Sequence, residues 1–190
     1  MQKIIKKTAN IIFVCIIVGV LIFLIAYSQK QYLKNAYPIK YSDYVEKYSQ
    51  EFNMDPLFVY AVIRTESGFS EKATSGIGAR GLMQITDETF EWISGRLGEK
   101  NKDFDSMYNA EECVKYGVYL LSYLKNTLGC ESNVLCGYHA GVNKAKQWLK
   151  DEKLTYDNII NPDKIPYSDT KQYVNKVMKT YRIYSDLYKK

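Results

Sequence analysis

Apolar and polar residues follow one another along most of this chain with the period of a helix. From Ser42 onward the apolar positions recur every three or four residues, and no stretch of strict alternation is long enough for a convincing strand. Ser42 precedes the first of these stretches and is expected to cap it. The pattern predicts a mainly α-helical domain over residues 42–190.

The most apolar segment of this domain is expected to be its central helix. Asp55 and Pro56 read as an N-cap followed by proline at the first helical position, and seven apolar residues follow over 57–63. A helix that is apolar nearly all round belongs in a core. It should end near Glu66, because the glycine-dotted stretch up to Gly81 is typical of a loop. A carboxylate therefore emerges from the most hydrophobic helix.

Further helices follow this loop. Asn109-Ala-Glu-Glu112 has the form of a capping box, and Gly129 is a stop signal for the helix that it opens. The helices expected after the loop run from 109 to 128, from 132 to 141, around Trp148 and Leu149, and from about Ser168 to Tyr188.

The N-terminal segment has the composition of a membrane anchor. Residues 11–27 are almost wholly apolar, and a bilayer core needs about 17–25 such residues in a helix. Lys3, Lys6 and Lys7 precede the segment, and basic residues favour the cytoplasmic side. We expect a single-pass protein of the cytoplasmic membrane, with a cytoplasmic N-terminus (1–10), a transmembrane signal-anchor (11–27), a tether (28–41) and an extracytoplasmic domain (42–190).

A cleaved signal peptide is the alternative for this segment. Its cleavage site would be Ala26-Tyr27-Ser28, which resembles the usual small-residue pattern only loosely. Either interpretation places the domain outside the cytoplasm. As an extended chain, the tether would reach roughly 45 Å at about 3.3 Å per residue.

The net charge of +5 belongs mainly to the anchor. Without Lys3, Lys6 and Lys7, 23 of the 26 basic residues remain against 21 acidic ones. This near balance does not support a concentrated basic face, so we expect no nucleic-acid partner.

Glu66 is the first candidate for chemistry. A carboxyl group at the edge of an apolar core loses hydration, which raises its pKa and keeps it protonated closer to neutral pH. A glycosidase needs such an acid to protonate the leaving oxygen. The ordinary alternative is a surface glutamate at a helix end.

Four strings, in order and with suitable spacing, resemble the catalytic domain of soluble-type lytic transglycosylases, which are relatives of goose-type lysozyme. The resemblance covers most of residues 42–181. The strings are E-S-G-F at 66–69, G-A-R-G-L-M-Q-I at 78–85, G-Y-H-A-G at 137–141 and I-P-Y-S-D-T-K-Q-Y-V at 165–174.

The resemblance implies a lysozyme-like helical fold that acts on the glycan strands of peptidoglycan. Glu66 would be the single acid/base that cleaves the β-1,4 bond between N-acetylmuramic acid and N-acetylglucosamine, leaving a 1,6-anhydromuramoyl end. No cofactor and no metal are implied. Cell-wall or secretion machinery is left open as a further partner.

The resemblance also assigns residues around the acid. Ser67 would hydrogen-bond the N-acetyl region or the catalytic carboxyl, and Gln84 would present its amide to the sugar. Met83 would line the cleft wall, while Tyr138 and Tyr173 would place hydroxyls near the acid. Without the family, the ordinary alternatives are a helix-end hydroxyl, a solvated amide, a core methionine and a tyrosine on a packed helix stripe.

The chain departs from the family beside the expected cleft. His139 stands where the family has asparagine, and Gly137 where it has alanine. We expect His139 to contact substrate, and its titration could affect substrate preference or the pH optimum. Asp169 and Lys171 replace glutamate and arginine and are expected to keep a structural ion pair.

Three rival functions stay open at this point. The same fold and acid could hydrolyse the bond as a muramidase, or the cleft could bind peptidoglycan without catalysis. Cys113, Cys130, Cys136 and His139 could form a zinc site, or Cys136 with His139 a nucleophile and its base, although the spacings are irregular for zinc. Cys130 and Cys136 could also pair as a disulfide.

Overall fold

The computed structural model describes the backbone of residues 2–189 and the side chains of Phe13 and of residues 15–189. It divides into two compact units, of which the first ends at Pro38 and the second begins at Ile39. The side chains of Lys3, Lys6 and Lys7 lie outside the described part, as do those of Ile11, Ile12 and Val14 in the predicted anchor.

The first unit is one long helix, α1 (Gln2–Ala36). Its segment Cys15–Ala36 has a mean hydropathy of 1.5, and by length and composition it could cross a membrane. This candidate span overlaps the predicted anchor. The helix continues without interruption to Ala36, so residues 28–36 of the predicted tether are helical.

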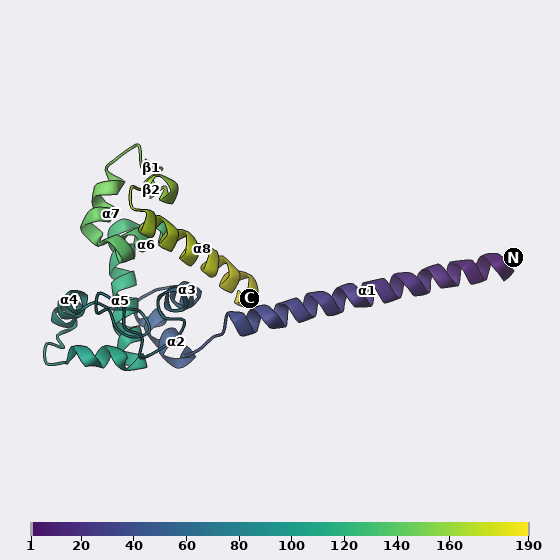
Figure 1. The fold of residues 1–190 in the computed structure, drawn as a ribbon, viewed down its shortest axis with the longest axis horizontal. Coiled ribbons are helices and arrows are strands. Elements are labelled where there is room, and N and C mark those ends of the chain that lie inside the picture. Colours follow the sequence, from purple (N-terminus) through teal and green to yellow (C-terminus); the bar gives the residue numbers. More distant parts are fainter. Residues whose placement is uncertain (1, 190) are drawn as a thin grey trace. The chain divides into compact units, whose positions relative to one another are not determined.

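The second unit is mainly α-helical, as the sequence predicts (Figure 1). Its strands form one two-stranded antiparallel hairpin, in which Thr155 pairs with Ile160. In chain order its elements are α2 (Ser42–Glu51), α3 (Pro56–Glu66), α4 (Asp87–Leu97), η1 (Phe104–Tyr108), α5 (Ala110–Leu128), α6 (Glu131–Ala140), α7 (Val142–Leu149), β1 (Thr155–Tyr156), β2 (Ile159–Ile160), η2 (Pro162–Lys164) and α8 (Ser168–Tyr188).

Two of the predicted helix caps are confirmed and one is wrong. The Asp55 carboxylate accepts a hydrogen bond from the Leu57 backbone N–H, and the Asn109 side chain accepts one from the N–H of Glu112. Ser42 is already inside α2. The preceding residue is Tyr41, which has a left-handed backbone (φ 59°) and makes no side-chain cap.

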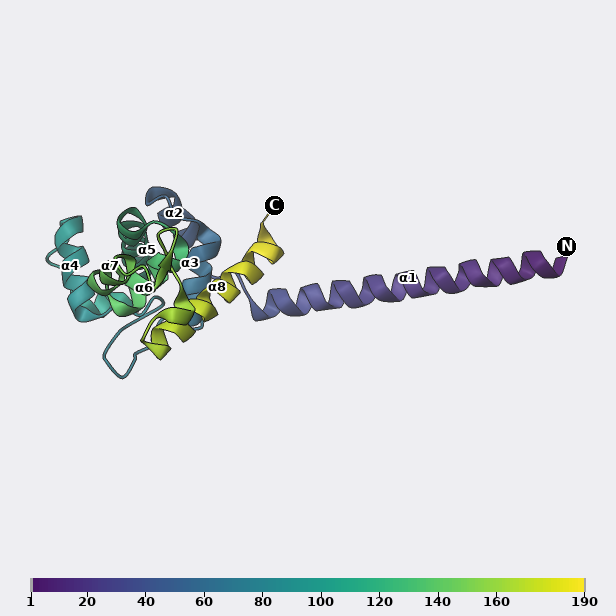
Figure 2. The ribbon, with the colours of Figure 1, turned by 90° about the horizontal axis from the view of Figure 1, so that it is seen from above.

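The core forms around α3, whose residues from Phe58 to Ile63 are fully buried. Helix α8 packs beside α3 (Figure 2). Phe58 meets the Tyr181 ring edge to face, with the centroids 5.3 Å apart, and the Tyr181 hydroxyl donates to Asp55 at 2.6 Å. These two contacts hold the N-terminal end of α3 at a fixed place along α8.

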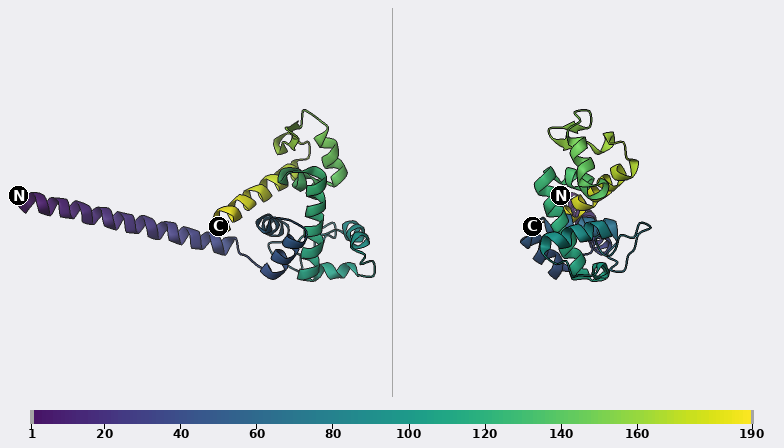
Figure 3. Two further views of the ribbon diagram at one scale, coloured as in Figure 1. Left: turned by 180° about the vertical axis from the view of Figure 1, so that it is seen from behind. Right: turned by 90° about the vertical axis from the view of Figure 1, so that its left-hand side faces the viewer.

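Helix α5 connects two groups of elements in this unit (Figures 1 and 3). One group contains α2, α3 and α4, and the other contains α6, α7 and the hairpin. Helix α8 contacts both groups, through α3 and α6. Residues that are far apart in sequence can therefore meet where α3, α6 and α8 come together.

Candidate active site

Glu66 and Tyr173 form the centre of the candidate site. Glu66 is the last residue of α3, and the Tyr173 hydroxyl on α8 donates a hydrogen bond of 2.5 Å to its Oε1. Tyr173 is buried, with 9% of its surface exposed. The packing of α8 on α3 thus orients the carboxyl of Glu66, which the sequence predicts to be the acid.

Burial is the main influence on the Glu66 carboxyl. It raises the pKa to about 7, although the hydrogen bond from Tyr173 and the positive charge of Lys176 both act to lower it. Burial also raises the pKa of the Tyr173 hydroxyl well above its ordinary value, so this group remains a donor. A carboxyl with this pKa exchanges a proton readily near neutral pH.

Ser67 supports the loop after α3. Its Oγ lies 2.8 Å from the Leu82 carbonyl oxygen and 3.2 Å from that of Ile63, and it accepts a hydrogen bond from the Phe69 N–H. Its proton therefore goes to a backbone carbonyl. Through these hydrogen bonds, Ser67 links the two ends of the loop over 67–85.

Gln84 also holds this loop, from a left-handed backbone position (φ 50°). Its amide nitrogen donates to the carbonyl oxygens of Ala73 and Gly81, at 3.2 and 2.9 Å. Both amide protons are used within the protein. The side-chain oxygen is the part of this amide that can still meet a ligand.

The side chain of Met83 is fully buried, so it does not line a cleft wall as expected. It packs against Gly117 of α5, where an added Cβ would overlap the methionine sulfur. The backbone of Met83 is more informative. Its carbonyl accepts a 2.6 Å hydrogen bond from the Tyr138 hydroxyl, and its N–H donates to the sulfur of Cys113.

Tyr138 therefore orients the loop and not the Glu66 carboxyl directly. Its hydroxyl lies near enough to Glu66 for the negative charge to raise its pKa, although burial is the larger cause. The preceding residue, Gly137, packs closely against α5. An added Cβ would lie 2.5 Å from a methyl group of Leu128 and 3.0 Å from one of Leu124, so an alanine there would require these side chains to move.

His139 packs against the ring of Tyr173, one of the central pair. The two rings lie 4.6 Å apart and are tilted by 33°, and His139 Nδ1 is 3.0 Å from the Thr170 hydroxyl. The residue keeps an exposed edge, but burial of the ring against α8 lowers its pKa, while the charge of Asp169 acts to raise it. His139 is thus a neighbour of Tyr173 that can still reach a ligand.

The expected ion pair in the last motif has a different partner. Lys171 pairs with Asp163, at 3.0 Å, and the Asp169 carboxylate instead accepts from the Thr170 N–H. The carboxylate of Asp169 supports the first turn of α8, where a negative charge is favourable.

The cysteines form neither the disulfide nor the zinc site that the sequence left open. Cys130 and Cys136 are free thiols, and Cys113 is bound to the loop backbone of Met83. Within residues 15–189, no group of three or more histidine, cysteine, aspartate or glutamate side chains could hold a metal ion.

Tyr138 also lines a pocket of about 610 Å³. Trp92 of α4 and Tyr123 of α5 line it, with their rings edge to face and 4.7 Å apart. Sequence reasoning missed these two aromatics and also Lys176. Lys176 follows Tyr173 by one helical turn, and that spacing could have revealed it.

Comparisons with known proteins identify the family of this domain. The family model described as the transglycosylase SLT domain matches residues 43–161. The soluble lytic murein transglycosylase of Salmonella typhimurium is 25% identical over 150 residues, which are 77% of this chain and 23% of that protein. The membrane-bound lytic murein transglycosylase C of Edwardsiella ictaluri is 27% identical over 168 residues, covering 76% of this chain and 46% of that one.

Solved structures share the fold as well. An inactive Glu-to-Gln mutant of the lytic transglycosylase Slt from Pseudomonas aeruginosa superposes with a TM-score of 0.73 at 26% identity, over 81% of this chain and 25% of that one. The chain spans about a quarter of the length of that protein and of the Salmonella relative. Since the family model covers more than half of the residues and the lysozyme-like fold agrees, the chain belongs to the transglycosylase SLT domain family.

Proposed function

We propose that this protein is a peptidoglycan lytic transglycosylase with Glu66 as its single acid/base. The observation that carries the proposal is the buried Glu66 carboxyl, whose pKa is raised to about 7 and whose Oε1 is held by Tyr173. A group with this proton affinity can both donate and accept a proton near neutral pH, which is what a one-carboxyl mechanism requires.

The proposed reaction has two proton transfers and uses no water. Protonated Glu66 donates to the glycosidic oxygen as the bond between that oxygen and C1 of N-acetylmuramic acid breaks, and the substrate's own acetamido group stabilises the cationic centre. The Glu66 carboxylate then takes the proton of the muramoyl 6-hydroxyl. That oxygen bonds to C1 and closes the 1,6-anhydro ring, and Glu66 is protonated again.

The neighbouring residues support this chemistry in distinct ways. Tyr173 fixes the carboxyl by its hydrogen bond, and Tyr138 fixes the adjoining loop through Met83. The free side-chain oxygen of Gln84 and the exposed edge of His139 are the polar groups assigned to the sugar. Trp92 and Tyr123 offer the apolar ring surface on which further sugars of the strand can pack.

Hydrolysis by a muramidase is the second candidate, and the surroundings of Glu66 favour the first. A second carboxylate acts as base or nucleophile in most glycoside hydrolases. The influences on the pKa of Glu66 are burial, Tyr173 and Lys176, and none of these is a carboxylate. A non-catalytic peptidoglycan-binding protein would have no use for the raised pKa.

The proposal includes a membrane anchor. α1 would cross the cytoplasmic membrane with its basic end inside, and the SLT domain would face the peptidoglycan outside. The similarity to a protein named membrane-bound lytic murein transglycosylase C supports such a location. A reporter fused after Lys190 should be active only in its extracytoplasmic form, and the opposite result would reverse the topology.

Mass analysis of the products tests the reaction. The purified protein is incubated with peptidoglycan, with Glu66→Gln as its matched control. Products lighter by one water than hydrolysis products, and absent with Glu66→Gln, are expected. Reducing-end products would establish a muramidase, and no release by a folded protein that binds the polymer would contradict catalysis. A chelator should leave the activity unchanged.

A further inference from the structure

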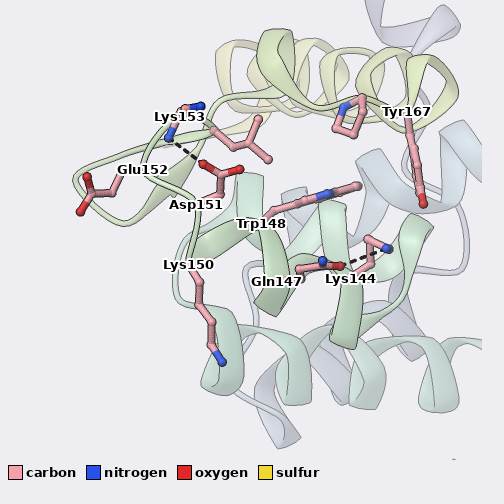
Figure 4. A pocket seen from close by; sticks show the side chains of 10 residues that line it. Lys144, Gln147, Trp148, Lys150, Asp151, Glu152, Lys153 and Tyr167 are labelled. Atoms are coloured by element: carbon pink, nitrogen blue, oxygen red, sulfur yellow. Dashed lines mark hydrogen bonds between the residues drawn. The ribbon is translucent and has the colours of Figure 1, made fainter.

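A second pocket, of about 680 Å³, lies between α7, the turn that follows it and the segment before α8 (Figure 4). Its volume falls in the range of about 300–1,000 Å³ that is usual for ligand sites. Of the four family strings, only the last reaches this pocket, through Pro166 and Tyr167, and the proposed reaction does not use it.

Aromatic side chains form one wall of this pocket. Trp148 is nearly fully buried, and its ring meets that of Tyr167 edge to face at 5.4 Å. Tyr167 is 43% exposed, so part of its ring remains available to a ligand. The wall can therefore bind apolar parts of a ligand without rearranging.

Lys144 supplies a cation that is held in place but not neutralised. Its ammonium donates to the side-chain oxygen of Gln147 at 3.0 Å and lies 5.7 Å from the centre of the Tyr167 ring (Figure 4). Neither partner carries a negative charge. By contrast, Lys47 and Lys115 each pair with a glutamate. A half-buried lysine whose ammonium is held by neutral partners favours an anionic ligand group.

The acidic residues of the pocket, Asp151 and Glu152, are outnumbered by its lysines, because Lys150 and Lys153 line it together with Lys144. The Asp151 carboxylate accepts a hydrogen bond from the Lys153 backbone N–H, which stabilises the turn after α7. Figure 4 shows the side chain of Glu152 directed away from Trp148 and Lys144. The combination of an aromatic wall and a net positive lining, with Lys144 beside the wall, fits a peptide that carries carboxylates.

The position of Lys144 connects this pocket with the pocket beside Tyr138. Lys144 lines both this pocket and the one beside Tyr138, so the two adjoin. In peptidoglycan, each muramic acid carries a short acidic peptide on its lactyl group. A glycan strand lying in the pocket beside Tyr138 would place such a peptide next to Lys144.

We propose that the pocket around Trp148, Tyr167 and Lys144 binds the stem peptide of peptidoglycan, with Lys144 pairing with a peptide carboxylate. This inference rests on the proposed function, because it assumes that the adjoining pocket holds the glycan. It assigns to this part of the domain the recognition of peptide-bearing strands over bare glycan.

Binding of a soluble stem tetrapeptide, alanyl-γ-glutamyl-diaminoacyl-alanine, tests the proposal without turnover. The full chain carrying Glu66→Gln is titrated in detergent, together with Lys144→Gln and, as matched control, Lys146→Gln on an exposed position of the same helix. Lys144→Gln should weaken binding roughly fivefold, as expected for a partly buried charge-assisted pair, and Lys146→Gln should not. Added salt should weaken binding by the unmodified pocket.

Three outcomes would overturn the proposal: no saturable binding of the tetrapeptide, equal loss with both lysine variants, or stronger binding of bare glycan or of a phosphate polymer at the same residues. Tyr167→Leu provides a second variant in the same pocket should Lys144→Gln lower the melting temperature. Because Glu66→Gln removes turnover, a failure of the proposed chemistry would appear only in the product masses and would leave this binding result readable.

Discussion

At Glu66, the burial that would suit the carboxyl to the proposed catalysis also opposes its charged form in the folded protein. Its folded pKa of about 7 exceeds the ordinary value of 4.5. The neutral Glu66 carboxyl therefore contributes fully to the stability of the folded protein below about pH 4.5. This contribution declines as pH rises, because the unfolded chain releases the proton first. Above about pH 7 it is lost, at a cost on the order of 3 kcal/mol or less.

Glu66→Gln should consequently stabilise the fold at alkaline pH only. Urea unfolding should give a higher free energy of unfolding for the variant by on the order of 2 kcal/mol at about pH 8, and little difference at about pH 4.5. A difference that does not change with pH would show that the carboxyl is not desolvated.

Tyr173→Phe should shift the pH profile of activity. The hydrogen bond from Tyr173 lowers the pKa of Glu66, so removing the hydroxyl raises that pKa above about 7. The acid form then persists to higher pH, and the alkaline decline of kcat/KM should move upward while the maximal rate falls roughly tenfold or more.

Tyr181→Phe is the matched control, because Tyr181 lies on the same helix and its hydroxyl bonds Asp55. This variant should lose stability and keep the pH profile. A shift of the same size in both variants would argue against a specific role of Tyr173.

His139→Ala should reduce kcat by removing the ring that packs on Tyr173. A ring pair of this kind contributes about 0.5–1.5 kcal/mol, which corresponds to roughly a 2- to 12-fold loss if it serves to hold the tyrosine. His139→Asn, which restores the family residue, should recover part of the rate. Steady-state kinetics of the two variants check this, and an unchanged kcat in His139→Ala would exclude the positioning role.

The sequence predicts Glu66 and Tyr173 better than it predicts the hydrogen bonds that hold the neighbouring loop. Glu66 is recognisable from the apolar helix that it ends, and Tyr173 from its motif. The partners of Ser67 and Gln84 are not, because a hydroxyl or an amide bonds whichever group the folded loop brings near. Leu82 lies 15 residues beyond Ser67 in sequence and takes its proton in the structure.

At the scale of elements, the loop between α3 and α4 depends on one close approach to its neighbours. Gly81 has φ +75°, and an added Cβ there would overlap the Met107 carbonyl oxygen and lie 2.9 Å from the Cys113 sulfur. Gly78 has a similar φ of +81° with open space around it. A substitution by alanine at each of the two glycines therefore distinguishes the free-energy cost of a left-handed backbone from the additional cost of a steric clash.

Gly78→Ala should lower the free energy of unfolding by about 1 kcal/mol, the cost of a left-handed non-glycine residue. Gly81→Ala carries this cost and the clash, so it should lose roughly 3 kcal/mol or more and displace the Met83 carbonyl that holds Tyr138. Thermal unfolding and activity of the pair check this. Equal losses would mean that the loop can move away from Met107.

Local signals set some element boundaries and fail at others. Asp55 and Pro56 start α3 as predicted, and α8 runs from Ser168 to Tyr188 as predicted. Helix α4 escaped prediction although Thr86 caps it, because its apolar stripe is short. The left-handed Tyr41 before α2 could not be foreseen, since Tyr41 reaches Phe69 only in the folded domain.

At the scale of the whole molecule, the two units are expected to be separable. The described side chains of α1 up to Tyr32 are all exposed, and the core lies within the second unit. Residues 39–190 alone should therefore keep the melting temperature of the full chain and its activity on solubilised glycan, but lose association with membranes. A drop in melting temperature by more than about 4 °C would reveal roughly 1 kcal/mol of stabilisation from α1.

The uninterrupted length of α1 limits how deep into the cell wall the enzyme can cut, given the proposed anchoring. As helix, residues 28–36 rise by only about 13 Å, and residues 37–41 add at most roughly 17 Å when extended. The reach from residue 28 to the domain is therefore at most about 30 Å, in place of the 45 Å of an extended tether. Cleavage would be confined to the layer of strands that faces the membrane, and outer layers would be out of range.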